Sequence, residues 1–254
     1  MYSPIWTPDA LRSELTAFEG RVWRIVEAQN RFSTMKVVPN LSKQSSLERV
    51  LDEAKPKVPA NCQHLDYLLS TPFRYDATYP RGSRFRRAGR SLGVYYSSAD
   101  IWSAVAEIVF YRLLLYADSP DIELPVNPVE FTAIEARLMT SRALPLDSPF
   151  FDGAREQISH LSNYGDCQAL VDVARDAGAE VILHRSVRDP HHGMNVALLN
   201  PIAFAEPKPT AFATIRLHFN RDSVRAVREF PFEAREFQIS DFAADTRIAP
   251  LINR

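Results

Sequence analysis

Residues 81–112 read RGSRFRRAGRSLGVYYSSADIWSAVAEIVFYR. Five arginines fall within the first ten positions, a tyrosine pair follows, and a long apolar run then holds one carboxylate, Glu107. Apolar side chains recur at helical spacing from Ile101 to Leu113, and Ser97 or Ser98 can cap this predicted helix. The order of these features indicates a site for a phosphate-bearing ligand, with one acidic group in an apolar environment.

The segments on either side alternate between helical and strand patterns. Helices are predicted from Thr7-Pro8 to Gly20, over 47–54, and from Asp166 to Gly178. Strands are predicted over 22–26, 131–138, 181–183, 196–199, 210–219 and 224–230, with a hairpin turn at Asn220-Arg221-Asp222. The chain shows no internal repeat and no break in composition. We therefore expect a single domain over 1–254 of the mixed α/β (α+β) class, with central β-structure flanked by helices.

Composition and charge exclude several broad classes of protein. The 254 residues are 46% hydrophobic and 24% charged, which is enough apolar surface to bury a full core. Thirty basic and 31 acidic side chains leave a formal charge of −1, so no overall field attracts nucleic acid or anionic lipid. Asp9 and Glu14 lie where a signal peptide needs apolar residues, and Cys62 and Cys167 show no metal-ligand or disulfide spacing. We expect a cytoplasmic protein without a membrane span.

The arginine-rich segment has two interpretations. The first is a solvated loop face, the usual role of a charge run, formed by Arg81, Arg84, Arg86, Arg87 and Arg90. The second rests on the use of arginine at all five positions, with glycine and phenylalanine between them and no lysine. A planar guanidinium binds two phosphate oxygens at once, which an ammonium group does not. One or two of these arginines would then clamp a pyrophosphate.

Glu107 also has two interpretations. On a helix, its neighbours three and four positions away are all uncharged, so no cation lies within that turn. Glu107 is either an ordinary glutamate paired elsewhere in the molecule, or a carboxylate that faces a ligand. In the second case, partial desolvation strengthens its interaction with developing positive charge. Periodicity alone does not distinguish the two.

Other motifs carry little chemistry. His191-His192 has no third ligand at a suitable spacing, so we assign no metal. Cys167 lies near a helix start beside Asp166, whose charge raises the pKa of a nearby thiol, so we expect no nucleophile there. The sequence contains neither a G-x-G-x-x-G fingerprint nor a P-loop, which argues against a Rossmann-type dehydrogenase or an ATPase.

A series of short motifs resembles the RES-domain family. They are Val22-Trp23-Arg24-Ile25, Tyr67-Leu68-Leu69, Pro72-Phe73-Arg74-Tyr75, Gly82-Ser83-Arg84-Phe85, Val94-Tyr95-Tyr96-Ser97, Ala104-Val105-Ala106-Glu107 and Ser186-Val187-Arg188-Asp189-Pro190. No single tetrapeptide is specific, but their order and spacing together are. The chain departs from many shorter members, which have a GGRWN-like segment where it has Gly82-Ser83-Arg84-Phe85-Arg86. It also has extra stretches around 34–66 and 203–254.

The resemblance implies a toxin of a bacterial toxin–antitoxin module, with an Xre-type DNA-binding antitoxin as partner and an ADP-ribosyltransferase-like fold. It also implies that NAD is consumed as a substrate and that no cofactor is needed. Family members are NAD phosphorylases or glycohydrolases, and one branch ADP-ribosylates a phosphoribosyl pyrophosphate synthetase, a protein acceptor. Each activity begins when the bond between nicotinamide and ribose breaks and positive charge builds on the ribose. No direct binding of this chain to DNA or to a membrane is expected.

The same resemblance suggests roles for individual residues. The family's namesake arginine, glutamate and serine would be Arg24 or Arg84, Glu107 and Ser186. Arg24 and Arg84 would clamp the pyrophosphate of NAD, and Tyr95 would offer its ring to nicotinamide. Glu107 would hold the ribose hydroxyls and stabilise the cationic centre, while Ser186 would hydrogen-bond the carboxamide or the ribose.

Each role has a simpler alternative. Tyr95 can be a strand tyrosine packed in the core, and Ser186 can be a turn former at a strand end. Arg112, just over one helical turn beyond Glu107, is a weaker candidate that either binds NAD or pairs with Glu107. A non-catalytic binder of nucleotide or RNA, using the arginine segment alone, also stays open.

Overall fold

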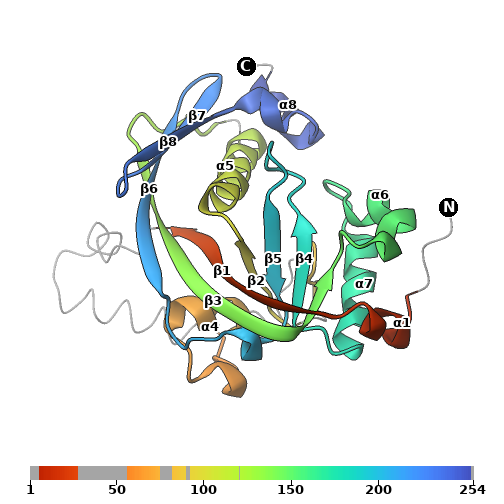
Figure 1. The fold of residues 1–254 in the computed structure, drawn as a ribbon. Helices are drawn as coiled ribbons and strands as arrows, with labels where there is room; N and C mark the ends of the chain where they lie inside the picture. Colours follow the sequence, from red (N-terminus) through yellow and green to blue (C-terminus); the bar gives the residue numbers. More distant parts are fainter. Residues whose placement is uncertain (1–5, 28–55, 75–81, 90–91, 120, 253–254) are drawn as a thin grey trace.

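A ring of five strands lies at the centre of the fold (Figure 1). The computed structural model describes residues 6–27, 56–74, 82–89, 92–119 and 121–252. The ring consists of β1 (Thr16–Glu27), β2 (Tyr95–Ser98), β5 (Met194–Leu198), β4 (Val181–Arg185) and β3 (Val129–Pro145). A ladder between β1 and β3 closes it, and β1 meets β2 through one residue pair, Trp23 opposite Ser98. Segments far apart in the sequence therefore become neighbours.

β3 connects the ring to the rest of the sheet because its 17 residues pair with three strands. It runs antiparallel to β1, from Glu27 opposite Phe131 to Thr16 opposite Ala143. Its first half also pairs antiparallel with β6 (Ala211–Phe219), and its last residues pair parallel with β4. β7 (Ser223–Arg228) and β8 (Glu233–Gln238) continue from β6, so the described part of the chain forms an eight-stranded sheet.

Helices and short 3-10 turns pack around this sheet. The α-helices are α1 (Pro8–Ser13), α4 (Tyr67–Arg74), α5 (Ile101–Asp118), α6 (Arg155–Ile158), α7 (Gly165–Asp176) and α8 (Ala249–Ile252). The 3-10 turns are η1 (Ala60–Cys62), η2 (Pro149–Ala154), η3 (Pro201–Ala203), η4 (Ile239–Phe242) and η5 (Thr246–Ile248).

α5 is the helix that carries Glu107. Its apolar side chains, such as Val109 and Leu113, pack against inward-facing residues of β6, including Ile215 and Leu217. Each such side chain contributes roughly 1.5–3 kcal/mol by leaving water. η5 and α8 pack against the same helix, and Figure 1 shows α8 beside its end. Contacts from both the sheet and the C-terminal segment therefore fix the position of Glu107.

A second apolar cluster lies around β4 and the last residues of β3. Leu144 of β3 and Ile182 of β4 pack in one cluster with Leu170 of α7 and Leu11 of α1. Figure 1 shows α1, α6 and α7 gathered on this side of the molecule. Phe85, from the arginine-rich segment, is buried in the same cluster, so this segment is anchored to the core.

The predicted strands are all confirmed, and the hairpin turn lies between β6 and β7. The first predicted helix is partly wrong: Thr7 caps it, but it ends at Ser13 because residues from Thr16 onward pair with β3. Gly178, with a φ of +83°, follows α7 as predicted. The predicted helix over 47–54 lies outside the described residues.

The caps of two helices differ from the predictions. α5 is capped by Asp100, whose Oδ1 accepts hydrogen bonds from the N–H groups of Trp102 and Ser103. Ser97 and Ser98 belong to β2 instead, where their backbone pairs with β5. For α7, Asp166 lies in the first turn and the cap position is held by the residue before Gly165. In both cases the error is a small shift along a correctly placed helix.

The mixed α/β class is confirmed by the central sheet and the helices around it. The extra C-terminal stretch from residue 203 supplies β6, β7 and β8 and so completes the sheet, while most of the stretch 34–66 lies outside the described residues. None of the helices in the described segments is long and apolar enough to cross a bilayer.

Candidate functional site

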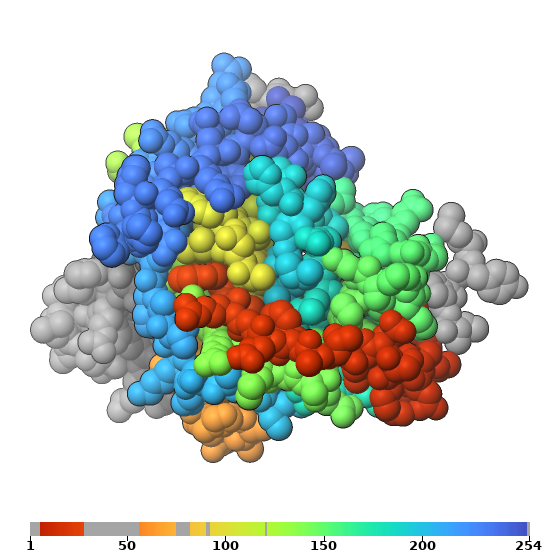
Figure 2. Space-filling view, in the orientation of Figure 1, coloured from red at the N-terminus to blue at the C-terminus, as the bar shows by residue number. Residues whose placement is uncertain are grey.

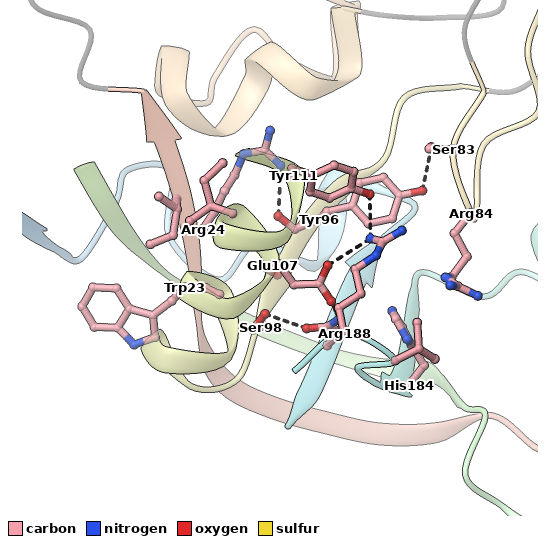
Figure 3. A pocket seen from close by; sticks show the side chains of 16 residues that line it. Trp23, Arg24, Ser83, Arg84, Tyr96, Ser98, Glu107, Tyr111, His184 and Arg188 are labelled. Carbon is pink, nitrogen blue, oxygen red and sulfur yellow. Dashed lines mark hydrogen bonds and ion pairs between the residues drawn. The ribbon is translucent and has the colours of Figure 1, made fainter. Parts of the chain in front are cut away.

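A cavity of about 300 Å³ lies where β1, β2, α5 and β5 meet the residues after β4. Figure 2 shows β1 in red, α5 in yellow and the β4–β5 region in cyan next to one another on one face. The lining residues are Trp23, Arg24, Ile25, Ser83, Arg84, Tyr96, Ser97, Ser98, Ala104, Glu107, Ile108, Tyr111, His184, Val187, Arg188 and Asn195. In Figure 3, Glu107 and Arg188 lie near the middle, with Arg24 and Arg84 on opposite sides.

Three side chains hold the carboxylate of Glu107. Its Oε1 accepts hydrogen bonds from Ser186 Oγ and Asn195 Nδ2, both at 2.7 Å. Its Oε2 forms an ion pair with Arg188 Nη1 at 3.1 Å. Ser98 Oγ donates to Asn195 Oδ1 at 2.6 Å and thereby turns the Asn195 amide nitrogen toward Glu107. The Glu107 side chain is 21% exposed, so the carboxylate is fixed but still accessible from the cavity.

These contacts decide the charge of Glu107. Burial raises its pKa, but the nearby Arg188 charge and the hydrogen bonds from Ser186, Asn195 and Arg188 outweigh burial, so the pKa lies below its usual value. Glu107 is therefore a carboxylate at neutral pH. It is suited to stabilising positive charge and unsuited to donating a proton.

Ser186 lies behind Glu107 and does not line the cavity. Its Oγ donates to Glu107 and accepts the N–H groups of Arg188 and Asp189, at 3.1 and 2.9 Å. A hydroxyl has one donor and two acceptor sites, so these three bonds saturate it. The predicted contact of Ser186 with a carboxamide or ribose is thus corrected: the side chain orients Glu107.

The loop after β4 is pressed closely against α5. Asp189 Oδ2 accepts hydrogen bonds from Ser103 Oγ of α5 at 2.7 Å and from Gly193 N at 3.1 Å. A Cβ at Gly193 would lie 1.9 Å from Ser103 Oγ, so only glycine allows this approach. The loop therefore has one position relative to α5, and with it Ser186 has one position relative to Glu107.

Arg188 is surrounded by aromatic rings. Its guanidinium carbon lies 4.3 Å from the ring centre of Phe110 and 4.6 Å from that of Tyr111. Nη1 also donates to Tyr111 Oη at 2.8 Å, and Nη2 donates to Tyr164 Oη at 2.6 Å. Burial lowers the pKa of Arg188, but its neighbours, above all Tyr111 and Glu107, outweigh burial and raise it. Arg188 is thus a permanently charged, immobilised partner for Glu107.

Arg24, on one side of the cavity, projects from β1. Its Nη1 donates to the backbone oxygen of Tyr96 at 2.9 Å, and its guanidinium carbon lies 5.1 Å from the Tyr95 ring centre. Among the described residues, no carboxylate pairs with it. Burial lowers the pKa of Arg24. An anionic ligand would offset this unfavourable desolvation.

Arg84, on the other side, lies in a tight turn closed by backbone hydrogen bonds between Ser83 and Arg86. Tyr96 Oη anchors the turn by bonding Ser83 Oγ at 2.8 Å and accepting from Phe85 N at 2.9 Å. Arg84 is 8% exposed and donates through Nη1 to Ile158 O at 3.1 Å. In the described segments, its buried Nη2 has no hydrogen-bond partner and no carboxylate pairs with the Arg84 guanidinium.

The solvated-face interpretation is therefore wrong for two of the five arginines, because Arg84 and Arg86 are both buried. Arg87 lies at the surface in an ion pair with Asp172. Arg81 and Arg90 lie outside the described residues.

His184 lines the cavity beside Arg84 (Figure 3). Burial and then the Arg84 charge lower the pKa of His184 to about 4, so its ring is neutral at physiological pH. The Nδ1 atom lies 3.1 Å from the backbone oxygen of Arg185 and must carry the proton to make that hydrogen bond. Nε2 is then left as an acceptor.

Two predicted site residues are corrected. Tyr95 is fully buried and packs edge-on against Phe204, because alternate residues of β2 point to opposite faces and Tyr96 is the one that lines the cavity. Arg112 does not line the cavity and forms an ion pair with Glu27 at the surface. The cation that pairs with Glu107 is Arg188.

The structure brings Arg24, Arg84 and Glu107 around one cavity, with Ser186 touching Glu107. Arg188, Asn195, His184 and Tyr96 were missed. Arg188 lies in the Ser186–Pro190 motif, and strand alternation offered a way to choose Tyr96 over Tyr95.

In the described segments, no three His, Cys, Asp or Glu side chains are placed to hold a metal ion.

A search of solved structures finds a chain from the crystal structure of the M. tuberculosis MbcT-MbcA toxin-antitoxin complex. The match covers 81% of this chain and 87% of that chain, at 11% identity and a TM-score of 0.48. No curated protein matches the sequence. A protein-family model described as the RES domain matches residues 58–222, which is more than half of the chain. The chain therefore belongs to the RES domain family.

Proposed function

We propose that this protein is an enzyme that breaks the bond between nicotinamide and ribose in NAD. The observation that carries the proposal is the Glu107 carboxylate, held by Arg188, Ser186 and Asn195 at the centre of the cavity. It is flanked by two arginines that pair with no carboxylate of the described residues. A single anion of this kind stabilises a cationic reaction centre, and the free arginines suit the anionic remainder of the substrate.

The charges of the cavity match those of NAD. Arg188 is neutralised by Glu107, which leaves Arg24 and Arg84 as two net positive groups. A pyrophosphate carries about two negative charges and accepts the paired hydrogen bonds that guanidinium groups donate. The unpartnered Nη2 of Arg84 would gain its hydrogen bond from such a ligand.

In the proposed reaction, the electron pair of the glycosidic bond passes to the nicotinamide nitrogen, and positive charge develops on the ribose. Glu107 stabilises this charge while Ser186, Asn195 and Arg188 keep the carboxylate in place and ionised. An acceptor then forms a bond to the same ribose carbon, and a water or protein acceptor releases a proton to solvent. Water, inorganic phosphate and a protein side chain give a hydrolase, a phosphorylase and an ADP-ribosyltransferase, respectively.

The test is to incubate purified protein with NAD, with and without inorganic phosphate, and to measure free nicotinamide. Labelled NAD in the presence of cell lysate shows whether the ribosyl group stays on a protein. We expect nicotinamide release, with the phosphate requirement and the fate of the label identifying the acceptor. No release under any of these conditions would contradict the proposal and favour a non-catalytic nucleotide or RNA binder.

We also propose that the protein acts as the toxin of a toxin–antitoxin module with an Xre-type antitoxin, as its resemblance to RES toxins implies. Expression alone should arrest growth and lower cellular NAD, and co-expression of an Xre-type protein encoded beside it should restore both. Growth arrest without a fall in NAD would separate toxicity from the proposed chemistry.

A further inference from the structure

Tyr164, at the start of α7, contacts two arginines of the site, Arg84 and Arg188. It is not among the residues that line the cavity. Its hydroxyl accepts the 2.6 Å hydrogen bond from Arg188 Nη2, and its ring lies 4.9 Å from the guanidinium carbon of Arg84. The hydroxyl thus binds Arg188, the partner of Glu107, and the ring contacts Arg84 at one side of the cavity.

The hydroxyl of Tyr164 matters because the other bonds of Arg188 leave its orientation incompletely defined. Nη1 is shared between Glu107 and Tyr111, and Nε is buried with no hydrogen-bond partner among the described residues. Within the described part of the chain, the one hydrogen bond of Nη2 is to Tyr164. Without this bond, the guanidinium would be held by one nitrogen and by ring contacts, which do not fix its rotation.

The C-terminal segment brings a charged side chain, Arg247, close to the same tyrosine. Asp245 is 4% exposed and binds Arg247 through two contacts, Nε to Oδ1 at 2.8 Å and Nη2 to Oδ2 at 2.6 Å. The Asp245 carboxylate, above all through its hydrogen bonds, raises the pKa of Arg247, and the neighbouring Tyr164 adds to this rise. Arg247 also lies 5.8 Å from the ring centre of Phe110, the same ring that lies 4.3 Å from the guanidinium carbon of Arg188. Asp245 and Arg247 follow the span matched by the RES family model, so this charge comes from outside that span.

We propose that Tyr164 is a positioning residue whose hydroxyl orients Arg188 toward Glu107 and whose ring holds Arg84 in the substrate-binding position. The proposal rests on the proposed NAD cleavage. It assigns two kinetic effects to two parts of one side chain: the hydroxyl acts on the chemical step, and the ring acts on substrate binding.

The experiment compares Tyr164→Phe with Tyr164→Leu in the full-length chain. Tyr164→Phe removes the hydroxyl and keeps the ring, so we expect kcat to fall about 5- to 30-fold with KM within twofold of wild type. Tyr164→Leu removes both, so we expect the same loss in kcat and an additional rise in KM of about 2- to 30-fold, the range of a cation–π contact. Tyr116→Phe is the matched control: Tyr116 is buried and is not among the residues that line the cavity, so this variant should keep both constants.

The pH profile of kcat separates positioning from a general loss of structure. A displaced Arg188 no longer keeps the pKa of Glu107 low, so the acidic limb of the Tyr164→Phe profile should shift to higher pH. Arg247→Gln should shift the limb in the same direction with a smaller loss in kcat, because it removes the charge next to Phe110 and Tyr164 and leaves the Tyr164 hydroxyl in place. An unfolded or merely loosened variant would lose amplitude with no shift.

If the wild-type protein releases nicotinamide and Tyr164→Phe keeps the wild-type kcat, the Tyr164 proposal is overturned and the proposed function is not. The same holds if both variants change kcat and KM in the same proportion, or if the acidic limb stays in place. Absence of nicotinamide release by the wild type would instead overturn the proposed function and, with it, this inference.

Discussion

The centre of the cavity and its two flanks are built in opposite ways. At the centre, Glu107 and Arg188 neutralise one another, and Ser186 and Asn195 complete the hydrogen bonds of the carboxylate. On the flanks, Arg24 and Arg84 are held by backbone oxygens and aromatic rings, with no carboxylate of the described residues beside them. The charges at the centre are paired without a ligand, whereas the flanks carry positive charge that an anionic ligand would neutralise.

This difference separates positioning from binding. A preorganised carboxylate requires no rearrangement when positive charge appears, which is the condition for strong electrostatic catalysis. Buried cations without a counter-ion are unfavourable, and an anionic substrate relieves that disadvantage as it binds. Changes at the centre should therefore reduce kcat, and changes on the flanks should raise KM.

The largest effect is expected for Glu107→Gln. The amide keeps the shape of the side chain but removes its charge, so kcat should fall by about 10²- to 10³-fold with KM little changed. Nicotinamide release measured over a range of NAD concentrations gives both constants. A folded variant with wild-type kcat would remove Glu107 from the mechanism.

This substitution also leaves Arg188 buried without its anion, which costs about 3–5 kcal/mol in comparable pairs. The double variant Glu107→Gln with Arg188→Met removes both charges. It should regain part of the lost stability in urea unfolding and regain none of the turnover. Recovery of turnover would contradict the central role of the carboxylate.

The flank is tested next by Arg84→Met, which keeps much of the packing against Tyr164. Loss of a charged hydrogen-bonding group should weaken NAD binding by about 1.5–3 kcal/mol, which corresponds to a rise in KM of roughly 10- to 150-fold. Arg87→Met is the matched control, because Arg87 pairs with Asp172 at the surface. A fall in kcat at constant KM would mean that flank and centre are not separate.

A pH effect on stability is expected from His184. Its pKa is about 4 in the folded protein against 6.5 ordinarily, so between these values the unfolded chain binds more protons than the folded one. Stability should therefore be full above pH 6.5 and decrease by about 1–3 kcal/mol as the pH falls toward 4. Urea midpoints of the wild type and His184→Gln at pH 7 and 5 measure this; equal pH dependence in both proteins would exclude His184 as the source.

The smallest effect is expected for Arg112→Ala. Arg112 pairs with the exposed Glu27 and lies outside the cavity lining, so turnover should change less than about twofold and stability by roughly 0–1 kcal/mol. A large rise in KM would mean that Arg112 binds substrate after all and that the binding site extends beyond the cavity.

The sequence allowed the strands and the long helix to be predicted because their apolar patterns are local. Glu107, Arg24 and Arg84 were predicted through family motifs, and the structure places them around one cavity. The partner of Glu107 was not predicted, because Arg188 is 81 residues away and local helix spacing reveals only nearby pairs.

Two other errors have equally physical causes. Tyr95 and Tyr96 are adjacent, and only the orientation of β2 within the sheet decides which ring enters the core. Ser97, Ser98 and Asp100 are all good helix caps, and pairing of the two serines with β5 leaves the role to Asp100. Both choices depend on strand partners that lie far away in the sequence.

The closed ring of strands has a consequence for how the protein is made. The chain contributes Arg24 early in synthesis, but Arg188 and Asn195 leave the ribosome only much later, and β5 must then insert between β2 and β4. Contacts of such long sequence separation form slowly. A nascent chain that stops before Ser186 lacks all three side chains that hold Glu107, and one that stops before β5 still lacks Asn195. The proposed NAD cleavage would therefore begin only after most of the protein has been translated.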